Sequence, residues 1–128
     1  MLHVLAVAVG GALGGMARFW VSEFVARRLQ ERFPWGTLVV NVTGSALIGV
    51  AAGLALSPEE PAIGPSSWAL LVIGVLGSYT TVSSFSLQTL VLFHAGYPGR
   101  AVGNVAASLS LCLAAAAAAW VSVDWMVA

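Results

Sequence analysis

The chain has 128 residues, of which 59% are apolar or aromatic and 8% are charged, with five Arg, no Lys and five Asp or Glu. Soluble globular domains carry about 25% charged residues, so this composition excludes a mainly water-facing surface and indicates an integral membrane protein. The formal net charge is zero and no basic stripe is present. Nucleic acid is therefore excluded as a main partner, because binding its phosphates needs clustered positive charge.

The N-terminal residues predict a retained membrane span. Residues 1–17 lack a basic leader and run on through Arg18 into further apolar chain, without a clean cleavage site. Cys112 is the only cysteine, so it cannot form an internal disulfide, and there is no Cys/His cluster to hold zinc. The redox compartment is left open.

Three long stretches without charge define the other spans. Residues 33–58, 61–99 and 101–123 contain no Asp, Glu, Lys or Arg, and a spanning helix needs about 20 mostly apolar residues. Pro and Gly mark turns at 33–36, 57–65 and 96–99. We predict a single transmembrane domain over residues 1–128, with helices near 3–27, 37–57, 66–95 and 99–125.

The third span is too long for a straight helix across a bilayer. About 30 residues would measure about 45 Å, against a hydrocarbon core of about 30 Å. Its middle, residues 74–81, reads GVLGSYTT, where Gly and Ser weaken the helix. We predict a break there, which a membrane tolerates only where the freed backbone groups are buried in protein or line a site. The alternative is a long helix that is merely kinked.

Neutral polar side chains gather after the predicted break. Six hydroxyls and one carboxamide fall within ten residues: Thr80, Thr81, Ser83, Ser84, Ser86, Thr89 and Gln88. At 100° per residue, one helical face carries Thr81, Ser84, Phe85 and Gln88, and a face of the fourth span carries Asn104, Ser108 and Cys112. Interhelical or back-bonded hydrogen bonds explain any single hydroxyl. The whole group beside a break favours a polar track.

The composition of this track suits a small dehydrated anion. Hydroxyls and carboxamides donate hydrogen bonds, and aromatic ring edges carry partial positive charge. A proton-coupled exporter needs an intramembrane acid or His, and the chain offers only Glu23 and His94, near span ends. Arg18, deep in the first span, either snorkels to the interface beside Glu23 or stands at a water-filled vestibule that attracts anions.

Small residues predict where helices meet. Gly-x-x-x-Gly spacings occur in the first two spans, and residues 114–119 are consecutive Ala. Because four thin helices barely enclose a path, we expect a homodimer. No pairing of nucleophile with base and no set of metal ligands is evident, so we do not expect an enzyme.

Three segments resemble the Fluc (CrcB-type) fluoride channels: GGALGGMARFW (10–20), WGTLVVNVTGSALIG (35–49) and GVLGSYTTVSSFS (74–86). The similarity runs through almost the entire chain. It implies an all-α protein of the inner (plasma) membrane that assembles as an antiparallel, dual-topology homodimer with two pores. It also implies passive export of cytoplasmic fluoride, which lowers fluoride toxicity. An inside-negative potential favours anion exit by about 2.3 kcal/mol per 100 mV.

The resemblance implies roles for individual pore residues. The family's pore Asn and its second pore Phe fall on Asn41 and Phe85, and the serine track of the last span falls on Ser108. The hydroxyl pair that passes fluoride to the vestibule falls on Ser83 and Ser84.

A vestibule and a cation site are also implied. Arg18 matches the family's first-span arginine, which favours its vestibule role. The carbonyls of Gly77 and Thr80 match those that hold a structural Na⁺ at the dimer interface, and unwound carbonyls suit this ion.

Four pore positions depart from the family pattern. Val82 stands where the first Phe is usual, Gln88 where Glu is frequent, and Asn104 and Cys112 where Tyr and Ser are frequent. One aromatic ring edge per pore is lost at position 82. We expect conduction to persist with an altered rate.

The arginines are distributed on one side only. With four spans, the first and third loops share a side and carry Arg27, Arg28, Arg32 and Arg100, although Arg27 and Arg28 fall where the first helix ends. The positive-inside rule then favours one orientation, whereas dual insertion expects little bias. The alternative function is a small proton-coupled multidrug or cation exporter of the four-helix dimer type, which the absence of a carboxylate in the first span disfavours. A membrane scaffold would need neither the break nor the hydroxyls.

Overall fold

The computed structural model describes residues 1–29, 32–55 and 63–127, and its regular elements are all helices. In chain order they are α1 (Leu2–Arg28), α2 (Trp35–Ala55), α3 (Pro65–Trp68), the π-helix η1 (Ala69–Leu76), α4 (Gly77–Tyr79), α5 (Val82–His94) and α6 (Pro98–Val127). Four helical stretches are long and apolar enough to cross a membrane, and α3 to α5 together form the third. The predicted all-α fold with four spans is confirmed.

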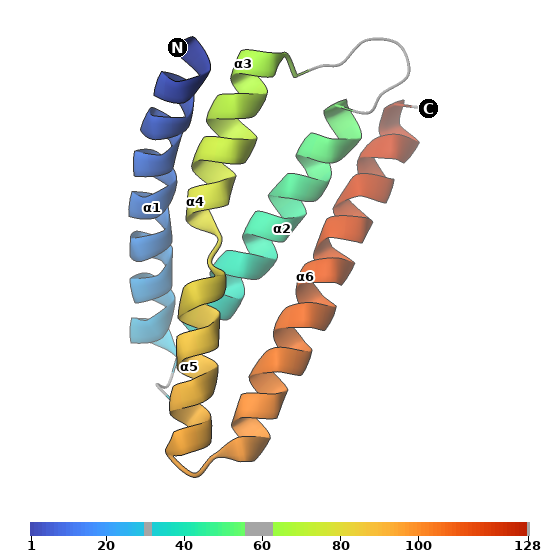
Figure 1. The fold of residues 1–128 in the computed structure, drawn as a ribbon. Helices are drawn as coiled ribbons and strands as arrows, with labels where there is room; N and C mark the ends of the chain where they lie inside the picture. Colours follow the sequence, from blue (N-terminus) through green and yellow to red (C-terminus); the bar gives the residue numbers. More distant parts are fainter. Residues whose placement is uncertain (30–31, 56–62, 128) are drawn as a thin grey trace.

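The spans run up and down, so the polypeptide has two distinct ends (Figure 1). The N-terminus, α3 and the C-terminal end of α6 lie at one end, and the end of α1 and the α5–α6 turn lie at the other. A hydrogen bond links the α1–α2 connection to the first turn of α6, from Arg100 Nη1 to the Arg32 carbonyl oxygen at 3.4 Å. The end of the predicted second span, residues 56 and 57, and the turn over 57–62 lie outside the described residues.

Helix α2 is the central element of the bundle. It contacts α1, η1, α5 and α6, and Val40 in its first half is fully buried. Small residues make these close contacts possible. A methyl group added at Gly49 would collide with the Ala116 carbonyl of α6, and one added at Gly44 would collide with Thr80 at the end of α4.

The third span is broken, as predicted. Its first half contacts α1, and its last segment, α5, contacts α6. Between them, Thr80 and Thr81 adopt extended backbone conformations, with ψ of 158° and 125°. The π-helical segment η1, which the sequence pattern did not predict, precedes this break. Helix α1 approaches η1 through Gly10 and Gly14, where an added methyl group would collide with the carbonyls of Leu70 and Val75.

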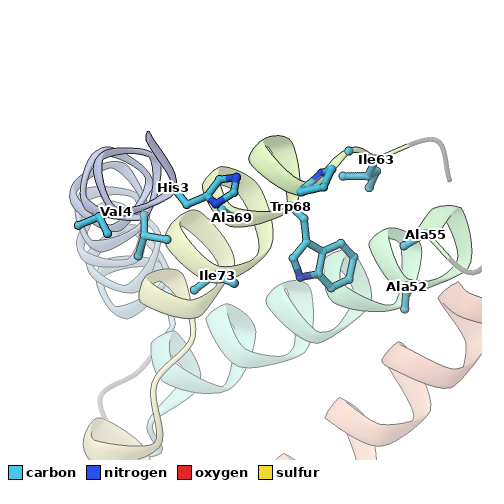
Figure 2. A pocket seen from close by; sticks show the side chains of 11 residues that line it. His3, Val4, Ala52, Ala55, Ile63, Trp68, Ala69 and Ile73 are labelled. Carbon is cyan, nitrogen blue, oxygen red and sulfur yellow. The ribbon is translucent and has the colours of Figure 1, made fainter. Parts of the chain in front are cut away.

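A large apolar cavity lies at the end that holds the N-terminus (Figure 2). Its volume is about 960 Å³, and α1, α2, η1 and the residues around α3 line it. His3 and the Trp68 indole lie among Val, Ala, Ile and Pro side chains in this lining. Such a lining offers no convergent set of polar groups, so this cavity is not the candidate site.

The contact between α1 and η1 generates a stability prediction. Gly14→Ala should lower the thermal unfolding midpoint of the detergent-solubilised protein, because the added methyl group overlaps the Val75 backbone and overpacking costs about 1–3 kcal/mol. Gly15→Ala is the matched control, since nothing lies within 4 Å of its added methyl group and Ala favours a helix. Equal midpoints for the two variants would contradict this close contact.

Candidate functional site

A row of polar side chains on α2 runs past the break. Thr37, Asn41 and Ser45 are spaced by four residues, so they share one face of the helix. Thr37 is buried and the other two are half-buried. This row brings hydroxyl and carboxamide groups to the level at which the third span is interrupted.

The Asn41 carboxamide binds the backbone of the break with both of its polar atoms. Its Nδ2 donates to the Thr81 carbonyl oxygen at 2.8 Å, and its Oδ1 accepts from the Thr81 N–H at 2.8 Å. An unpaired backbone group in a membrane interior is costly. Asn41 therefore gives the Thr81 amide the acceptor that the break removes, and it adds a donor to the Thr81 carbonyl, which also begins the hydrogen-bond ladder of α5.

Thr81 caps the helix that follows the break. Its Oγ1 accepts from the Ser84 N–H at 3.2 Å, which satisfies one of the free amides at the start of α5. The same hydroxyl lies 3.2 Å from the hydroxyl oxygens of Ser83 and Ser84. Three hydroxyls are thus connected directly after the break.

Two backbone carbonyls lose their usual helical donors at this point. In a continuous helix the Thr81 N–H would bind the Gly77 carbonyl, and the Ser84 N–H would bind the Thr80 carbonyl. The first amide donates to Asn41 and the second to the Thr81 hydroxyl. Carbonyl oxygens released in this way are hard ligands of the kind that an alkali cation prefers.

The first of two polar cavities, here called the side cavity, opens on the flank of the bundle. Its volume is about 500 Å³. Helices α2, α5 and α6 and the break contribute its lining, which comprises Asn41, Ser45, Ile48, Gly77, Thr80, Thr81, Val82, Phe85, Ser108, Leu109, Cys112 and Leu113. Seven predicted site residues therefore converge here, from three separate parts of the sequence.

The second, here called the arginine cavity, lies between α1, α2 and the start of α5. It holds about 210 Å³, and its lining comprises Gly15, Arg18, Phe19, Ser22, Thr37, Val40, Thr81 and Ser84. Glu23 pairs with Arg27 at 2.9 Å and not with Arg18. Within the described part of the chain no carboxylate lines this cavity, so a cation and several hydroxyls face it together, which favours an anion.

Thr81 lines both cavities and is itself buried. The Asn41 contact fixes its backbone, and the Ser84 amide and hydroxyl engage its side chain. Thr81 therefore forms part of the wall between the arginine cavity and the side cavity.

The remaining predicted residues lie near these cavities without lining them. Asn104 is 2% exposed and donates from Nδ2 to the Thr89 hydroxyl at 2.8 Å, which joins α6 to α5. Gln88, one turn after Ser84, has a buried Oε1 without a hydrogen-bond partner. Ser83 is exposed and reaches the site only through Thr81.

Other intramembrane hydroxyls serve structure. Thr43 and Ser110 donate to backbone carbonyls four residues earlier, Val39 and Ala106, at 2.7 Å each. Such back-bonds are ordinary for Ser and Thr in membrane helices. These hydroxyls therefore do not belong to the track.

Thr37 and Ser45 line the cavities, although the sequence pattern did not single them out. Thr81, which the sequence pattern placed in the polar track without a role of its own, lines both cavities. The spacing of four that joins Thr37, Asn41 and Ser45 is visible in the sequence and predicts their common face. Thr81 stands three residues before Ser84 at a helix start, which is the spacing of an N-cap.

Together the fold and the cavities define a small helical membrane protein in which two cavities adjoin Thr81 beside a broken helix. Comparison with known proteins places the chain in a family: residues 5–120 match the family described as "CrcB-like protein, Camphor Resistance (CrcB)". The chain belongs to this family.

Curated relatives share about half of their aligned residues with this chain. "Fluoride-specific ion channel FluC 2" of Bradyrhizobium diazoefficiens is 53% identical over 121 residues, which cover 94% of this chain and 88% of the relative. "Fluoride-specific ion channel FluC 2" of Rhodopseudomonas palustris is 52% identical, with coverage of 89% and 87%. "Fluoride-specific ion channel FluC" of Opitutus terrae is 52% identical, with coverage of 87% and 84%.

The carboxamide contact at the break generates a second prediction. Asn41→Ala should lower the thermal unfolding midpoint and speed hydrogen exchange at the Thr81 amide, because this amide loses its acceptor and the Thr81 carbonyl loses one donor. An unsatisfied buried group costs about 1–3 kcal/mol. Ser45→Ala is the control one turn further along α2. A Thr81 amide equally protected in both variants would contradict the bridging role of Asn41.

Proposed function

We propose that this protein is a fluoride-specific ion channel that lets cytoplasmic fluoride leave the cell passively. The observation that carries the proposal is the chemistry of the two cavity linings. Among the described residues, the side cavity has no charged side chain, and the arginine cavity has Arg18 as its one charged side chain, without a carboxylate. Membership of a family whose relatives are named fluoride-specific channels supports the same ion. The protein is a multi-pass membrane protein, which in bacteria belongs to the inner membrane.

The direction of transport follows from acid chemistry and membrane potential. Hydrogen fluoride is a weak acid that crosses membranes in its neutral form and dissociates in the cytoplasm. An inside-negative potential then drives the anion outward by about 2.3 kcal/mol per 100 mV. No proton coupling is needed, in keeping with cavities that the described residues line without an acid or a histidine.

The site residues have the following proposed roles. Arg18 attracts the anion to the arginine cavity, where Ser84 and Thr37 donate hydrogen bonds in place of water. In the side cavity, Asn41, Ser108 and the ring edge of Phe85 line the pore, together with Val82 and Cys112. Ser83, Gln88 and Asn104 act next to the path. Neutral donors hold a dehydrated anion more weakly than cations do, which lets it move on.

Pairing of two copies as an antiparallel, dual-topology homodimer would close the side cavity. This cavity opens on the flank of the bundle, and Val82 beside it is 75% exposed. Hydroxyls and freed backbone carbonyls are costly against lipid. A second copy covers them and completes two pores.

A structural sodium ion at that interface is the proposed cofactor. The Gly77 and Thr80 carbonyls have lost their helical donors, because Asn41 and the Thr81 hydroxyl bind the corresponding amides. Both residues line the side cavity. Two such carbonyls from each copy would offer a cation four hard oxygen ligands, and the ion would neutralise their partial charge.

Fluoride efflux from proteoliposomes tests the proposal. We expect fluoride to leave down its gradient, faster than chloride, with and without a proton gradient. Phe85→Ile and Ser108→Ala should each slow fluoride, by about tenfold for one lost contact worth about 1.4 kcal/mol. Ser110→Ala is the matched control, because its hydroxyl is bonded to the Ala106 carbonyl.

Two other results of the efflux measurement would contradict the proposal. Efflux that requires the proton gradient would indicate a coupled exporter, and the absence of any fluoride efflux would overturn the proposal. Val82→Phe should raise the fluoride rate, because it adds an aromatic ring edge beside Phe85. An unchanged rate would exclude position 82 from the pore.

Labelling of an introduced cysteine tests dual insertion. On a Cys112→Ser background, Ser66→Cys provides an exposed thiol on α3, at the end opposite the arginines. Impermeant reagent added outside intact cells should label about half of the protein, with the rest labelled only after lysis, if both orientations occur. One-sided labelling is what the arginine bias alone predicts, and it would contradict the antiparallel dimer.

A further inference from the structure

The end of the molecule that carries the arginines has a third pocket, separate from the two polar cavities. The turn pocket, as we call it, holds about 480 Å³, and its lining comprises Arg32, Val91, Leu92, Ala95, Tyr97 and Arg100. Arg32 precedes α2 and Arg100 begins α6, so two distant segments bring two guanidinium groups to one place. We propose that the turn pocket binds an anionic phospholipid, with the phosphate at the arginines and an acyl chain along α5.

The polar half of the pocket is arranged for a phosphate. Arg100 Cζ lies 4.4 Å from the centroid of the Tyr97 ring, and its Nη1 donates to the Arg32 carbonyl oxygen at 3.4 Å. These contacts orient the guanidinium and occupy few of its five N–H donors, so a fork remains for a phosphate. Helix α6 begins at Pro98 beside this pocket, and the positive end of its dipole adds to the charge of the arginines. The Arg100 and Ala101 amides themselves donate to the Tyr97 carbonyl.

No negative charge from the described lining offsets these two cations. Among the residues that the structure describes, none with a carboxylate lines the pocket, and Arg27 is the arginine that Glu23 neutralises. Arg28 lies over the Phe24 ring at 5.1 Å, on α1 and outside the pocket. Charge complementarity therefore favours an anion at Arg32 and Arg100.

The rest of the pocket is apolar and continues along the last turns of α5. Val91 is exposed and Leu92 and Ala95 lie beside it, so hydrocarbon-contacting surface begins directly next to the arginines. Exposed Tyr97 and Trp35 stand at the same end, where aromatic side chains mark the membrane interface. A charged head joined to an apolar chain fits both halves, whereas a free phosphate would leave the apolar half unused.

Native mass spectrometry of the purified full-length protein in detergent tests this inference. With equal amounts of phosphatidylglycerol and phosphatidylcholine, we expect the protein to retain the anionic lipid about tenfold more. The double variant Arg32→Gln/Arg100→Gln should bring that ratio close to one while phosphatidylcholine retention stays unchanged. The control Arg27→Gln/Arg28→Gln removes the same charge from the same end and should keep the wild-type ratio.

Two results would overturn the inference. One is an equal loss of lipid preference in both double variants, which would assign the effect to diffuse surface charge. The other, measured on the wild-type protein alone, is displacement of phosphatidylglycerol by soluble glycerophosphoglycerol at equal concentration, which would show that the apolar half contributes nothing. Because none of the four arginines lines the polar cavities, fluoride efflux by both variants should match the wild type and report that they are folded.

Discussion

The site depends on one pair of hydrogen bonds, between the Asn41 carboxamide and the backbone of Thr81. A helix interrupted inside a membrane exposes amides and carbonyls that lipid cannot satisfy. Asn41 binds one of each with a single side chain, and it does so from α2, the helix that contacts α1, η1, α4, α5 and α6. These bonds lower the free-energy cost of the extended conformation at Thr80 and Thr81. The hydroxyls and carbonyls around it are the groups that we propose bind ions.

The distribution of charged side chains also follows from the cost of polar groups inside a membrane. Inside the bundle, donors are neutral except for Arg18, and the one described acid near it, Glu23, is engaged by Arg27. In the proposed channel, a small anion would be attracted to the arginine cavity and would meet weaker neutral donors beyond it. This sequence of sites would balance the cost of removing water against the need to release the ion. The other four arginines lie at the end of α1, before α2 and in the first turn of α6, which are the segments where a spanning protein reaches headgroups and water.

Much of this arrangement could be predicted from the sequence, because charge spacing and Gly-rich segments report directly on spans and close contacts. The length of a span alone does not predict whether its helix is broken. The third span and α6 both cover 30 residues, yet only the former is broken. The distinguishing signal was chemical: Thr81 can cap a new helix, and Asn41 stands on a neighbouring helix to bind the freed backbone. The π-helix η1 and the partition of hydroxyls between the cavities and back-bonds depend on tertiary contacts, which no local pattern encodes.

The two halves of the broken span belong to different helix pairs. Backbone contacts at Gly10 and Gly14 tie η1 to α1, whereas Asn104 and Thr89 tie α5 to α6. The molecule therefore consists of two helix pairs, α1 with η1 and α5 with α6, which Thr80 and Thr81 connect. Helix α2 contacts both pairs. If the two helix pairs were displaced relative to each other, for example in a bilayer of different thickness, the backbone dihedral angles of these two residues would change most. Because Thr81 lines both cavities, the proposed ion path would be the part of the protein most sensitive to deformation of the surrounding membrane.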